Sequence, residues 1–288
     1  MKKNITVIGL GYVGCSMAVL LAERNNIYAV DIDKNKINKL LNKESPIKDK
    51  DISQHLIEKE LNLYPSTELE SNLHNSDYVI ICTPTNFDES KKTFDTSSIK
   101  KILKTLNSKN FGGIVVIKST IPIGFTEAMK QNYPRLDILF SPEFLRAEHA
   151  MEDFKKQEFT YIGGGDTAFW AGILSMRLGT TVVTHDPEVL ILTKYFRNSF
   201  LAAKVAFFNQ MYDVCEATGV DANEVLTYTA LDDRIGTSHT KVTKERGYGG
   251  HCFPKDVSAI LKTVEQLGGD LSILGEVQNY NKDVRGRK

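Results

Sequence analysis

The sequence predicts an α/β protein in which a doubly wound parallel sheet, over residues 1–186, precedes an all-helical domain over residues 187–288. Short β-branched runs alternate with helix-like segments through the first two-thirds of the chain, as they do in parallel sheets with crossover helices. A glycine-rich turn joins the first of these runs to the first helical segment. Beyond residue 186 the strand-like runs give way to one long apolar helical segment.

The expected elements of the sheet domain follow in chain order. Helix-like segments lie between several of the strand-like runs, at about residues 16–24, 33–41 and 97–106. The predicted strands are residues 5–8, 27–32, 78–82, 114–117, 138–140, 161–163 and 181–184.

The glycine-rich turn, Gly9-Leu10-Gly11-Tyr12-Val13-Gly14, follows the first strand and opens the first helix, and Asp31 comes about 20 residues after it. The first glycine permits a tight turn, the second lets a pyrophosphate reach the helix N-terminus, and the third lets helix and strand pack closely. Asp31 would accept hydrogen bonds from an adenosine ribose and repel a 2′-phosphate. This context predicts a Rossmann-type dinucleotide site that prefers NAD to NADP.

Three other predicted strands run into polar, proline-containing turns. Ligands of doubly wound sheets bind at the carboxyl ends of the strands, where these turns lie. Turn chemistry alone would account for any one of them, but three at one edge favour a functional site. They are Thr83-Pro84-Thr85, Lys118-Ser119-Thr120-Ile121-Pro122 and Ser141-Pro142-Glu143-Phe144.

The long helical segment is expected over residues 187–218, with Asp186 as its N-cap and Gly219 as its terminator. Apolar residues cover most of its circumference, so we expect it to be buried at a domain or subunit interface. Lys194 and Asn198 stand out on it because they are four residues apart and share one face. A buried ammonium group needs a partner, which makes this pair a candidate site.

The segment Gly247-Tyr248-Gly249-Gly250-His251-Cys252-Phe253-Pro254-Lys255-Asp256 places one cysteine between a glycine-rich loop and a polar turn. The glycines would let the backbone approach a ligand closely. A cation such as Lys255 would favour the thiolate, the reactive form of cysteine. Cys252 is therefore the candidate nucleophile, whereas Cys15, Cys82 and Cys215 fall on helical or strand patterns typical of packing residues.

The composition limits the classes of function. The 36 basic and 36 acidic residues balance, which gives no support for a nucleic-acid or membrane-surface role. No apolar run approaches the roughly 20 residues of a membrane helix, and no signal peptide is indicated. The four cysteines are widely spaced, which indicates neither a zinc site nor a disulfide framework. We expect a cytoplasmic protein without a metal.

With these segments in view, the chain resembles the UDP-glucose/GDP-mannose dehydrogenase family. The matching segments run in family order from residue 9 to residue 256: GLGYVG, AVDID, CTPTN, IKSTIPIGFT, FSPEFLR, LTKYFRNSFLAAKVAFFNQM, DDRIG and GYGGHCFPKD. The resemblance implies that the primary alcohol of a nucleotide sugar is oxidised to a carboxylate, with two NAD consumed per turnover. DDRIG and TPTN favour UDP-glucose as the sugar nucleotide.

The resemblance also implies roles for single residues. Cys252 would attack the intermediate aldehyde, so that a thiohemiacetal and then a thioester form on its sulfur. Lys194 would stabilise the oxyanion, Asn198 would hold the sugar and a water, and Asp256 would assist that water. Thr120 and Glu143 would place the water and serve in base chemistry. Implied cofactor contacts are Lys36, Thr83, Thr120 and Lys255, beside the glycine-rich turn and Asp31. Implied substrate contacts are Glu143, Phe144, Leu145, Lys194, Asn198, Arg234 and Gly249, with Arg234 reaching across a dimer interface.

Two departures from the family pattern affect these expectations. Many members read FLRE where this chain reads FLRA, so the role of that second glutamate is not assigned to Glu148. Members usually carry a further C-terminal nucleotide-binding domain beyond the equivalent of Lys288. Because one chain can cover only part of the apolar helix at residues 187–217, we expect a homodimer formed through that helix. Without the further domain, unless a separate polypeptide supplies it, we expect this dimer to bind NAD but to have weak or no dehydrogenase activity.

Three alternatives remain open. The substrate could be GDP-mannose or a UDP-N-acetyl sugar, since base recognition lies partly in the further domain. A β-hydroxyacid-type dehydrogenase also combines a Rossmann domain with a helical domain, but such enzymes do not need the GYGGHC loop. A catalytically weak NAD-binding or dimerisation subunit is the third. The intact Lys194, Asn198, Cys252 and Asp256 speak against it, and the short C-terminal part speaks for it.

Overall fold

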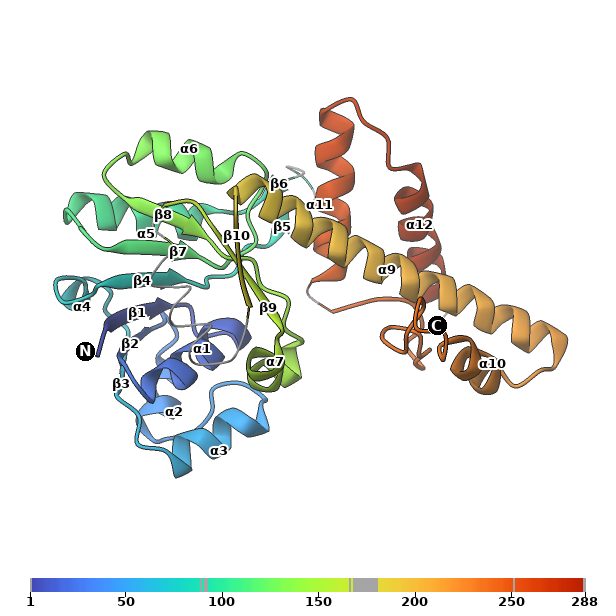
Figure 1. Cartoon of the computed structure of the whole chain (residues 1–288), viewed down its shortest axis with the longest axis horizontal. Coiled ribbons are helices and arrows are strands. Elements are labelled where there is room, and N and C mark those ends of the chain that lie inside the picture. The colour runs from blue at the N-terminus through green and yellow to red at the C-terminus, as the bar shows by residue number, and fades with distance from the viewer. Residues whose placement is uncertain are drawn as a thin grey trace. The chain divides into compact units, whose positions relative to one another are not determined.

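The computed structural model describes residues 2–88, 90, 93–165, 167, 181–250 and 252–286 (Figure 1). The chain divides into two compact units. The first comprises Met1–Asn86 and Phe94–Leu192, and the second comprises Phe87–Thr93 and Thr193–Lys288. This division falls inside the long helix, and the boundary at residues 186–187 stays a prediction from the sequence.

The first unit is built on an eight-stranded sheet with the order β10-β9-β8-β7-β4-β1-β2-β3. Every pair of neighbours is parallel except β8 and β9, which meet in antiparallel fashion at Phe140 and Gly163. The predicted fold class is thus confirmed, with one antiparallel contact added. The strands are β1 Asn4–Ile8, β2 Asn26–Val30, β3 Leu63–Ser66, β4 Tyr78–Ile81, β7 Ile114–Ile117, β8 Asp137–Phe140, β9 Phe159–Gly163 and β10 Thr181–His185.

Strand β3 was not predicted, because Pro65 interrupts its short run. Proline cannot donate a ladder hydrogen bond and is tolerated at the edge of a sheet, and β3 is the edge strand beyond β2. At the centre of the sheet, β1 and β4 are neighbours whose successors, β2 and β7, lie on opposite sides. This reversal of strand order is where doubly wound sheets bind their ligands.

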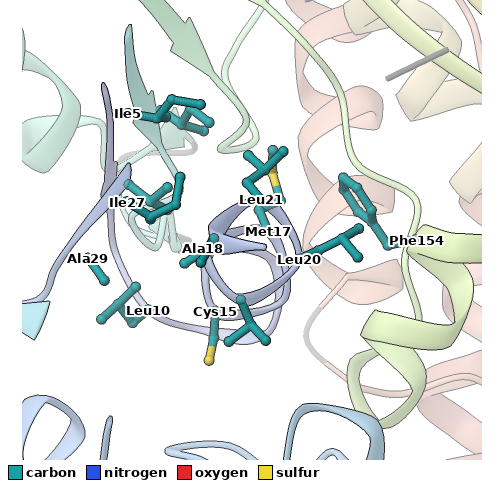
Figure 2. Close-up of a cluster of buried hydrophobic side chains, with 14 of the residues drawn as sticks. Ile5, Leu10, Cys15, Met17, Ala18, Leu20, Leu21, Ile27, Ala29 and Phe154 are labelled. Carbon is teal, nitrogen blue, oxygen red and sulfur yellow. The ribbon is translucent and has the colours of Figure 1, made fainter. Parts of the chain in front are cut away.

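Helix α1 (Tyr12–Ala22) forms the centre of the first unit's core and begins four residues earlier than the sequence predicts. Most of its side chains are buried, and they meet residues of β1, β2 and α7 (Figure 2). Met17, Leu20 and Phe154 are each at most 2% exposed. Burial of such a side chain contributes roughly 1.5–3 kcal/mol. The unit's other helices are α2 Lys34–Leu41, α3 Lys50–Glu58, α4 Glu70–Leu73, α5 Ser97–Ser108, α6 Phe125–Asn132, the 3₁₀ turn η1 Ala147–His149 and α7 Ala150–Lys156.

The second unit is helical. It contains α10 Ala222–Thr229, α11 Phe253–Gln266, α12 Ser272–Gly286 and most of α9 Pro187–Thr218, together with the short strand β5 Phe87–Asp88. Strand β5 pairs with β6 Thr93–Phe94. The ends of α9 are those predicted: the Glu188 amide donates to Asp186 Oδ1 over 2.8 Å, and Gly219 has a φ of +69°.

Within the single chain α9 is buried along one side only, and its burial at a domain or subunit interface stays a prediction. Tyr195, Ala202 and Phe208 are buried, but Phe200 is 68% exposed and Phe196 and Phe207 are exposed by more than half. The helix therefore buries one side within its own chain and presents a row of phenylalanines on another.

Two further observations concern the described residues. None of their helices is both long enough and apolar enough to cross a bilayer. Nor do they bring together three or more His, Cys, Asp or Glu side chains in a group that would hold a metal ion.

Candidate active site

The glycine-rich turn between β1 and α1 uses its three glycines in different ways. Gly9 has a φ of +92°, and a Cβ there would lie 2.8 Å from the Cys82 carbonyl carbon at the end of β4. A Cβ on Gly14 would collide with the carbonyl oxygen of Gly9. In contrast, within the described part of the chain no heavy atom beyond its chain neighbours and its own helix's backbone lies within 4 Å of a Cβ built on Gly11. The first and third glycines make room for the chain itself, and the second leaves open space.

The N-terminus of α1 faces this space with its first amide groups uncapped. Gly11 is the N-cap residue and offers no side chain, and the first turn, which begins Tyr12-Val13, carries no acidic residue. Free amide groups and the helix dipole together favour an anion at such a position. The residues therefore fit the pyrophosphate of a dinucleotide.

Asp31 follows β2 and is 7% exposed. Its Oδ2 accepts hydrogen bonds from the Leu10 amide (2.7 Å) and the Lys36 ammonium (2.9 Å), and its Oδ1 accepts from the Asp33 amide (2.9 Å). A carboxylate has about four acceptor positions, so one remains on Oδ1 for a ribose hydroxyl. Burial alone would raise the pKa of Asp31, but the donors Asp33, Lys36 and Leu10 outweigh it and hold the pKa below its usual value.

A buried ion pair lies where β7 and β8 end. The Lys118 ammonium is 3.1 Å from Glu143 Oε2 and donates to Ser141 Oγ, also at 3.1 Å. The side chains of Lys118 and Glu143 are 3% and 8% exposed, so each charge depends on the other. Glu143 is one of the predicted site residues, whereas Lys118 was named only as part of the polar turn after its strand. A lysine ending an apolar strand was the signal that would have identified it.

The neighbouring strand ends are joined by Ser119, whose hydroxyl donates to the carbonyl oxygen of Thr83 over 2.7 Å. Thr83 Oγ1 is also 3.0 Å from Ser98 Oγ, and Thr120 is buried beside Ser119. The predicted edge residues Thr83, Thr120 and Glu143 thus belong to one rim of the first unit. Phe144 stacks edge-on against Tyr161, and Leu145 packs on the core.

The second unit brings together residues of α9 and α11. Asn198 donates through Nδ2 to Asp256 Oδ2 over 2.6 Å, and Asp256 is completely buried. Its other oxygen, Oδ1, has no hydrogen-bond partner among the described residues. Lys194, one turn before Asn198 on α9, is 6% exposed. A buried carboxylate oxygen without a donor is an acceptor available to a ligand or a water.

Cys252 is the N-cap residue of α11, and its carbonyl accepts the first helical hydrogen bond, from the Asp256 amide. All four cysteines lie in the described ranges, and Cys252 is the exposed one. Cys15 and Cys215 are buried, and burial raises the pKa of the Cys15 and Cys82 thiols to about 12. Cys252 is therefore the thiol most accessible to a reagent.

Lys255 lies in the first turn of the same helix. Its burial lowers the pKa of the ammonium group, Asp256 opposes this change, and Lys194 adds to it. The pKa of Lys255 thus depends on two other predicted site residues, Asp256 and Lys194. His251, the preceding residue of the predicted motif, lies outside the described residues.

Two of the glycines before Cys252 do not serve the predicted close approach to a ligand. A Cβ on Gly247 would collide with Asn281 Oδ1 of α12, and one on Gly249 would lie 2.9 Å from an Arg285 nitrogen. These two glycines make room for α12 rather than for a ligand. Within the described residues the space beside Gly250 is open. A substrate contact at Gly249 would therefore use its backbone.

Arg234 lies in an exposed turn after α10. Its guanidinium binds Asp232 two residues earlier, at 2.6 Å from NH2 to Oδ2, and 89% of its side chain is exposed. The turn itself is held by Lys204 of α9, whose ammonium donates to the Ile235 and Gly236 carbonyl oxygens. Arg234 is thus an exposed side chain on a turn that is hydrogen-bonded to α9.

Comparisons with known proteins agree with these observations. Residues 3–174 match the NAD binding domain of the UDP-glucose/GDP-mannose dehydrogenase family, and residues 190–283 match the central domain of that family. The chain is 34% identical over 268 residues to a UDP-glucose 6-dehydrogenase of Streptococcus pneumoniae, covering 89% of this chain and 68% of that protein.

Solved structures are similar over nearly the whole chain. A UDP-glucose dehydrogenase from the archaeon Pyrobaculum islandicum has a TM-score of 0.87 at 27% identity, covering 98% of this chain and 68% of that one. A GDP-mannose dehydrogenase from Pseudomonas aeruginosa has a TM-score of 0.73 at 26% identity, covering 97% and 68%. The chain thus spans about two-thirds of the length of these relatives. It belongs to the UDP-glucose/GDP-mannose dehydrogenase family, with that family's NAD-binding domain as its first unit and the central domain in its second.

Proposed function

We propose that this member of the nucleotide-sugar dehydrogenase family oxidises the primary alcohol of UDP-glucose to the carboxylate of UDP-glucuronate, with Cys252 as the nucleophile. The observation that carries the proposal is the arrangement of α11. An exposed thiol caps the helix, and one turn later Asp256 is buried against Asn198 with one oxygen lacking a partner among the described residues. The similarity to UDP-glucose 6-dehydrogenases supports the choice of sugar nucleotide.

The reaction balances as two oxidations and one hydrolysis. The –CH₂OH group first loses a hydride and a proton to become an aldehyde. The Cys252 thiol then adds to the carbonyl: a C–S bond forms, and the thiol proton passes to the oxygen. This thiohemiacetal loses a second hydride and its hydroxyl proton to give a thioester, which water cleaves to the carboxylate, the thiol and one proton. Bound NAD takes up the hydride in each oxidation.

Residues of the second unit would serve these steps. Lys194 would stabilise the negative oxygen that develops when the thiol, and later the water, adds to the carbonyl. Asp256 Oδ1 would accept a proton from the attacking water, and Asn198 holds the opposite oxygen so that Oδ1 keeps one direction. The N-terminus of α11 would add further stabilisation for negative charge at Cys252.

Residues of the first unit would bind NAD and place water. The open side of Gly11 and the uncapped start of α1 fit the pyrophosphate, and the remaining acceptor position on Asp31 fits the ribose. We assign water placement and base chemistry to Thr120 and Glu143, and cofactor contacts to Lys36 and Thr83, as the family resemblance implies. A cofactor contact of Lys255, a residue of the second unit, is proposed on the same ground.

We also propose that the exposed side of α9 joins a second copy of the chain. Phe196, Phe200, Phe207 and Val214 recur at spacings of four and seven residues, so they form one apolar stripe along the helix. Two such stripes related by a twofold axis would cover each other, and each phenylalanine would contribute roughly 1.5–3 kcal/mol on burial. Light scattering should give twice the chain mass, and Phe200→Lys should give a monomer. A wild-type monomer at micromolar concentration would contradict this arrangement.

A second candidate substrate is GDP-mannose, since a GDP-mannose dehydrogenase shares the fold at 26% identity. A panel of UDP-glucose, GDP-mannose and UDP-N-acetyl sugars distinguishes these candidates. Single-turnover conditions, with protein in excess over the sugar nucleotide, detect the reaction even when turnover is slow. We expect two NADH per UDP-glucose and a carboxylate product by mass spectrometry. One NADH per sugar, with an aldehyde product, would exclude the thioester route.

A further inference from the structure

The loop that leads into Cys252 is held by contacts with α9 and α12 that the sequence motifs do not indicate. The side-chain amide of Asn281, on α12, pairs with both backbone groups of Tyr248: Oδ1 accepts from the Tyr248 amide over 2.6 Å, and Nδ2 donates to the Tyr248 carbonyl over 3.0 Å. Asn281 is 7% exposed and Tyr248 is 3% exposed. One side chain therefore satisfies both backbone groups of the buried Tyr248.

The start of the same loop is fixed from α9. Arg246 donates through Nε to Asn209 Oδ1 over 2.9 Å and through NH2 to the Asn209 carbonyl over 3.1 Å. It also binds Asp213 and lies 4.8 Å from the centre of the Tyr212 ring. The Gly247 amide also donates to Asn209 Oδ1, over 2.9 Å. Arg246 and Asn209 thus fix the chain one residue before the Asn281 contact.

This support continues to the first turn of α11. The Tyr248 ring meets Phe253 edge-on, with centroids 6.4 Å apart, and Phe253 is the residue after Cys252. Arg285, another residue of α12, donates to the Arg246 carbonyl over 3.1 Å, and Gly247 and Gly249 have no side chains to keep α12 away. The loop is therefore held against α9 and α12, and Tyr248 also contacts the first turn of α11.

We propose that Asn281 and Arg246 are positioning residues that set the place of the Cys252 thiol at the N-terminus of α11. Neither residue touches the sulfur. They act through Tyr248 and Phe253, which connect α12 and α9 to the helix that Cys252 caps. The proposal rests on the proposed function, in which Cys252 attacks the aldehyde, because misplacement of a nucleophile by about 1 Å lowers turnover by up to about a hundredfold.

The main test replaces Asn281 with Leu, which keeps the side-chain size but removes both hydrogen bonds to Tyr248. Asn279→Leu is the matched control, since Asn279 is the same residue type on the same helix and is exposed. We expect Asn281→Leu to lower kcat about tenfold or more, with KM for NAD and sugar nucleotide changed less than about twofold. Alkylation of Cys252 by iodoacetamide should slow by about threefold or more, and Asn279→Leu should match the wild type.

A purely structural role predicts a different result. The melting temperature of Asn281→Leu would fall, but kcat and Cys252 alkylation, measured well below that temperature, would equal those of the wild type. That outcome overturns the proposal. Arg246→Lys provides a second variant in case Asn281→Leu does not fold, because lysine keeps the charge but lacks the planar fork that binds Asn209. It should lower kcat and alkylation by about threefold, and unchanged values would also overturn the proposal.

The alkylation rate and hydrogen exchange at residues 246–250 do not depend on the substrate. If the wild type oxidises none of the sugar nucleotides, the proposed function fails, while these two measurements still decide whether Asn281 and Arg246 hold the Cys252 loop. Faster exchange and slower alkylation in Asn281→Leu, without any activity, would support the positioning role alone.

Discussion

Each unit of the molecule has a glycine-rich loop that leads into a helix, and the two loops are held in different ways. The loop of the first unit, residues 9–14, is fixed by its own turn and by Asp31, which follows the adjacent strand. The loop of the second unit, residues 246–250, is fixed by Asn209 and Asn281, which lie more than 30 positions away on either side. The comparison indicates that the first loop is held by its own turn and by the ends of neighbouring strands, whereas the loop before the candidate nucleophile Cys252 is held by side chains of two helices.

The largest effect is expected from replacing Cys252, because this change should affect catalysis by the second loop but not NAD binding by the first. Cys252→Ala should abolish the carboxylate product, a loss of about a thousandfold or more, because no thioester can form. NAD binding, followed by fluorescence titration, should be unchanged because the first loop is intact. Cys215→Ala, at a buried cysteine, is the control and should keep its activity. Turnover in Cys252→Ala close to that of the wild type would rule out covalent catalysis.

A smaller effect is expected at the buried Lys118–Glu143 ion pair on the rim of the first unit. Lys118→Met leaves Glu143 buried without its cation and should lower the free energy of unfolding by about 3 kcal/mol. The double variant Lys118→Met/Glu143→Gln removes both charges and should recover most of this loss, without recovering activity. Chemical denaturation measures both values. Equal stabilities of single and double variants would show that the two charges do not depend on each other.

The glycines of the first loop provide a paired test. Gly14→Ala should destabilise the protein by roughly 1–3 kcal/mol, because the added methyl group meets the Gly9 carbonyl. Gly11→Ala should leave the melting temperature nearly unchanged but weaken NAD binding about tenfold, because its methyl group fills the open space. If both variants lose the same stability, or if Gly11→Ala binds NAD normally, the assignment of the second glycine to the cofactor is wrong.

Cofactor preference should change more modestly. Asp31→Ser removes the ribose acceptor and the negative charge, so NAD binding should weaken about tenfold and the preference for NAD over NADP should narrow. Lys36, which binds Asp31, would then be free to attract a 2′-phosphate. The ratio of kcat/KM values for the two cofactors measures the change. Equal use of both cofactors by the wild type would contradict a ribose contact at Asp31.

The smallest effect concerns acid stability. The native contacts of Asp31 lower its pKa, so its ionised form stabilises the fold above the unfolded value of about 3.9, and this contribution is lost as the pH falls through the native pKa. Asp31→Asn lacks this contribution. The difference in unfolding free energy between wild type and variant should therefore be largest above about pH 5 and decrease towards pH 2. A difference that is constant over this range would contradict it.

The features that the sequence predicted well depend on residues close together in the chain. The strand–turn–helix unit, the N-cap of α9 and the pairing of Lys194 and Asn198 on one face each follow from spacings of a few residues. The fold class followed because the alternation of strands and helices is itself local. The edge strand β3 was missed because Pro65 obscures its pattern, although an edge tolerates it.

The features that were missed depend on tertiary contacts. Lys118 and Ser141 meet because β7 and β8 are neighbours in the sheet, and the two polar turns, although both were expected at one edge, do not by themselves indicate this contact. Asn281 was not predicted because an asparagine in a polar helix does not by itself indicate a contact. Only the fold places it beside Tyr248. The role of Gly247 was predicted wrongly for the same reason, because the side chain that occupies the space beside it, Asn281, comes from α12.

The short segment Phe87–Thr93 belongs to the second unit, although the residues before and after it in the chain belong to the first. No single cleavage of the chain would therefore separate the two units. The segment follows β4 of the first unit, joins the second unit, and the chain then returns to form α5. Phe87 lines a cavity of about 570 Å³ beside Leu261 of α11 and Leu271. A fragment that begins at α9 would lack this segment and leave that surface uncovered. Recombination between related genes at the start of α9 would likewise pair the helices with a foreign segment, so the two units are expected to be inherited together.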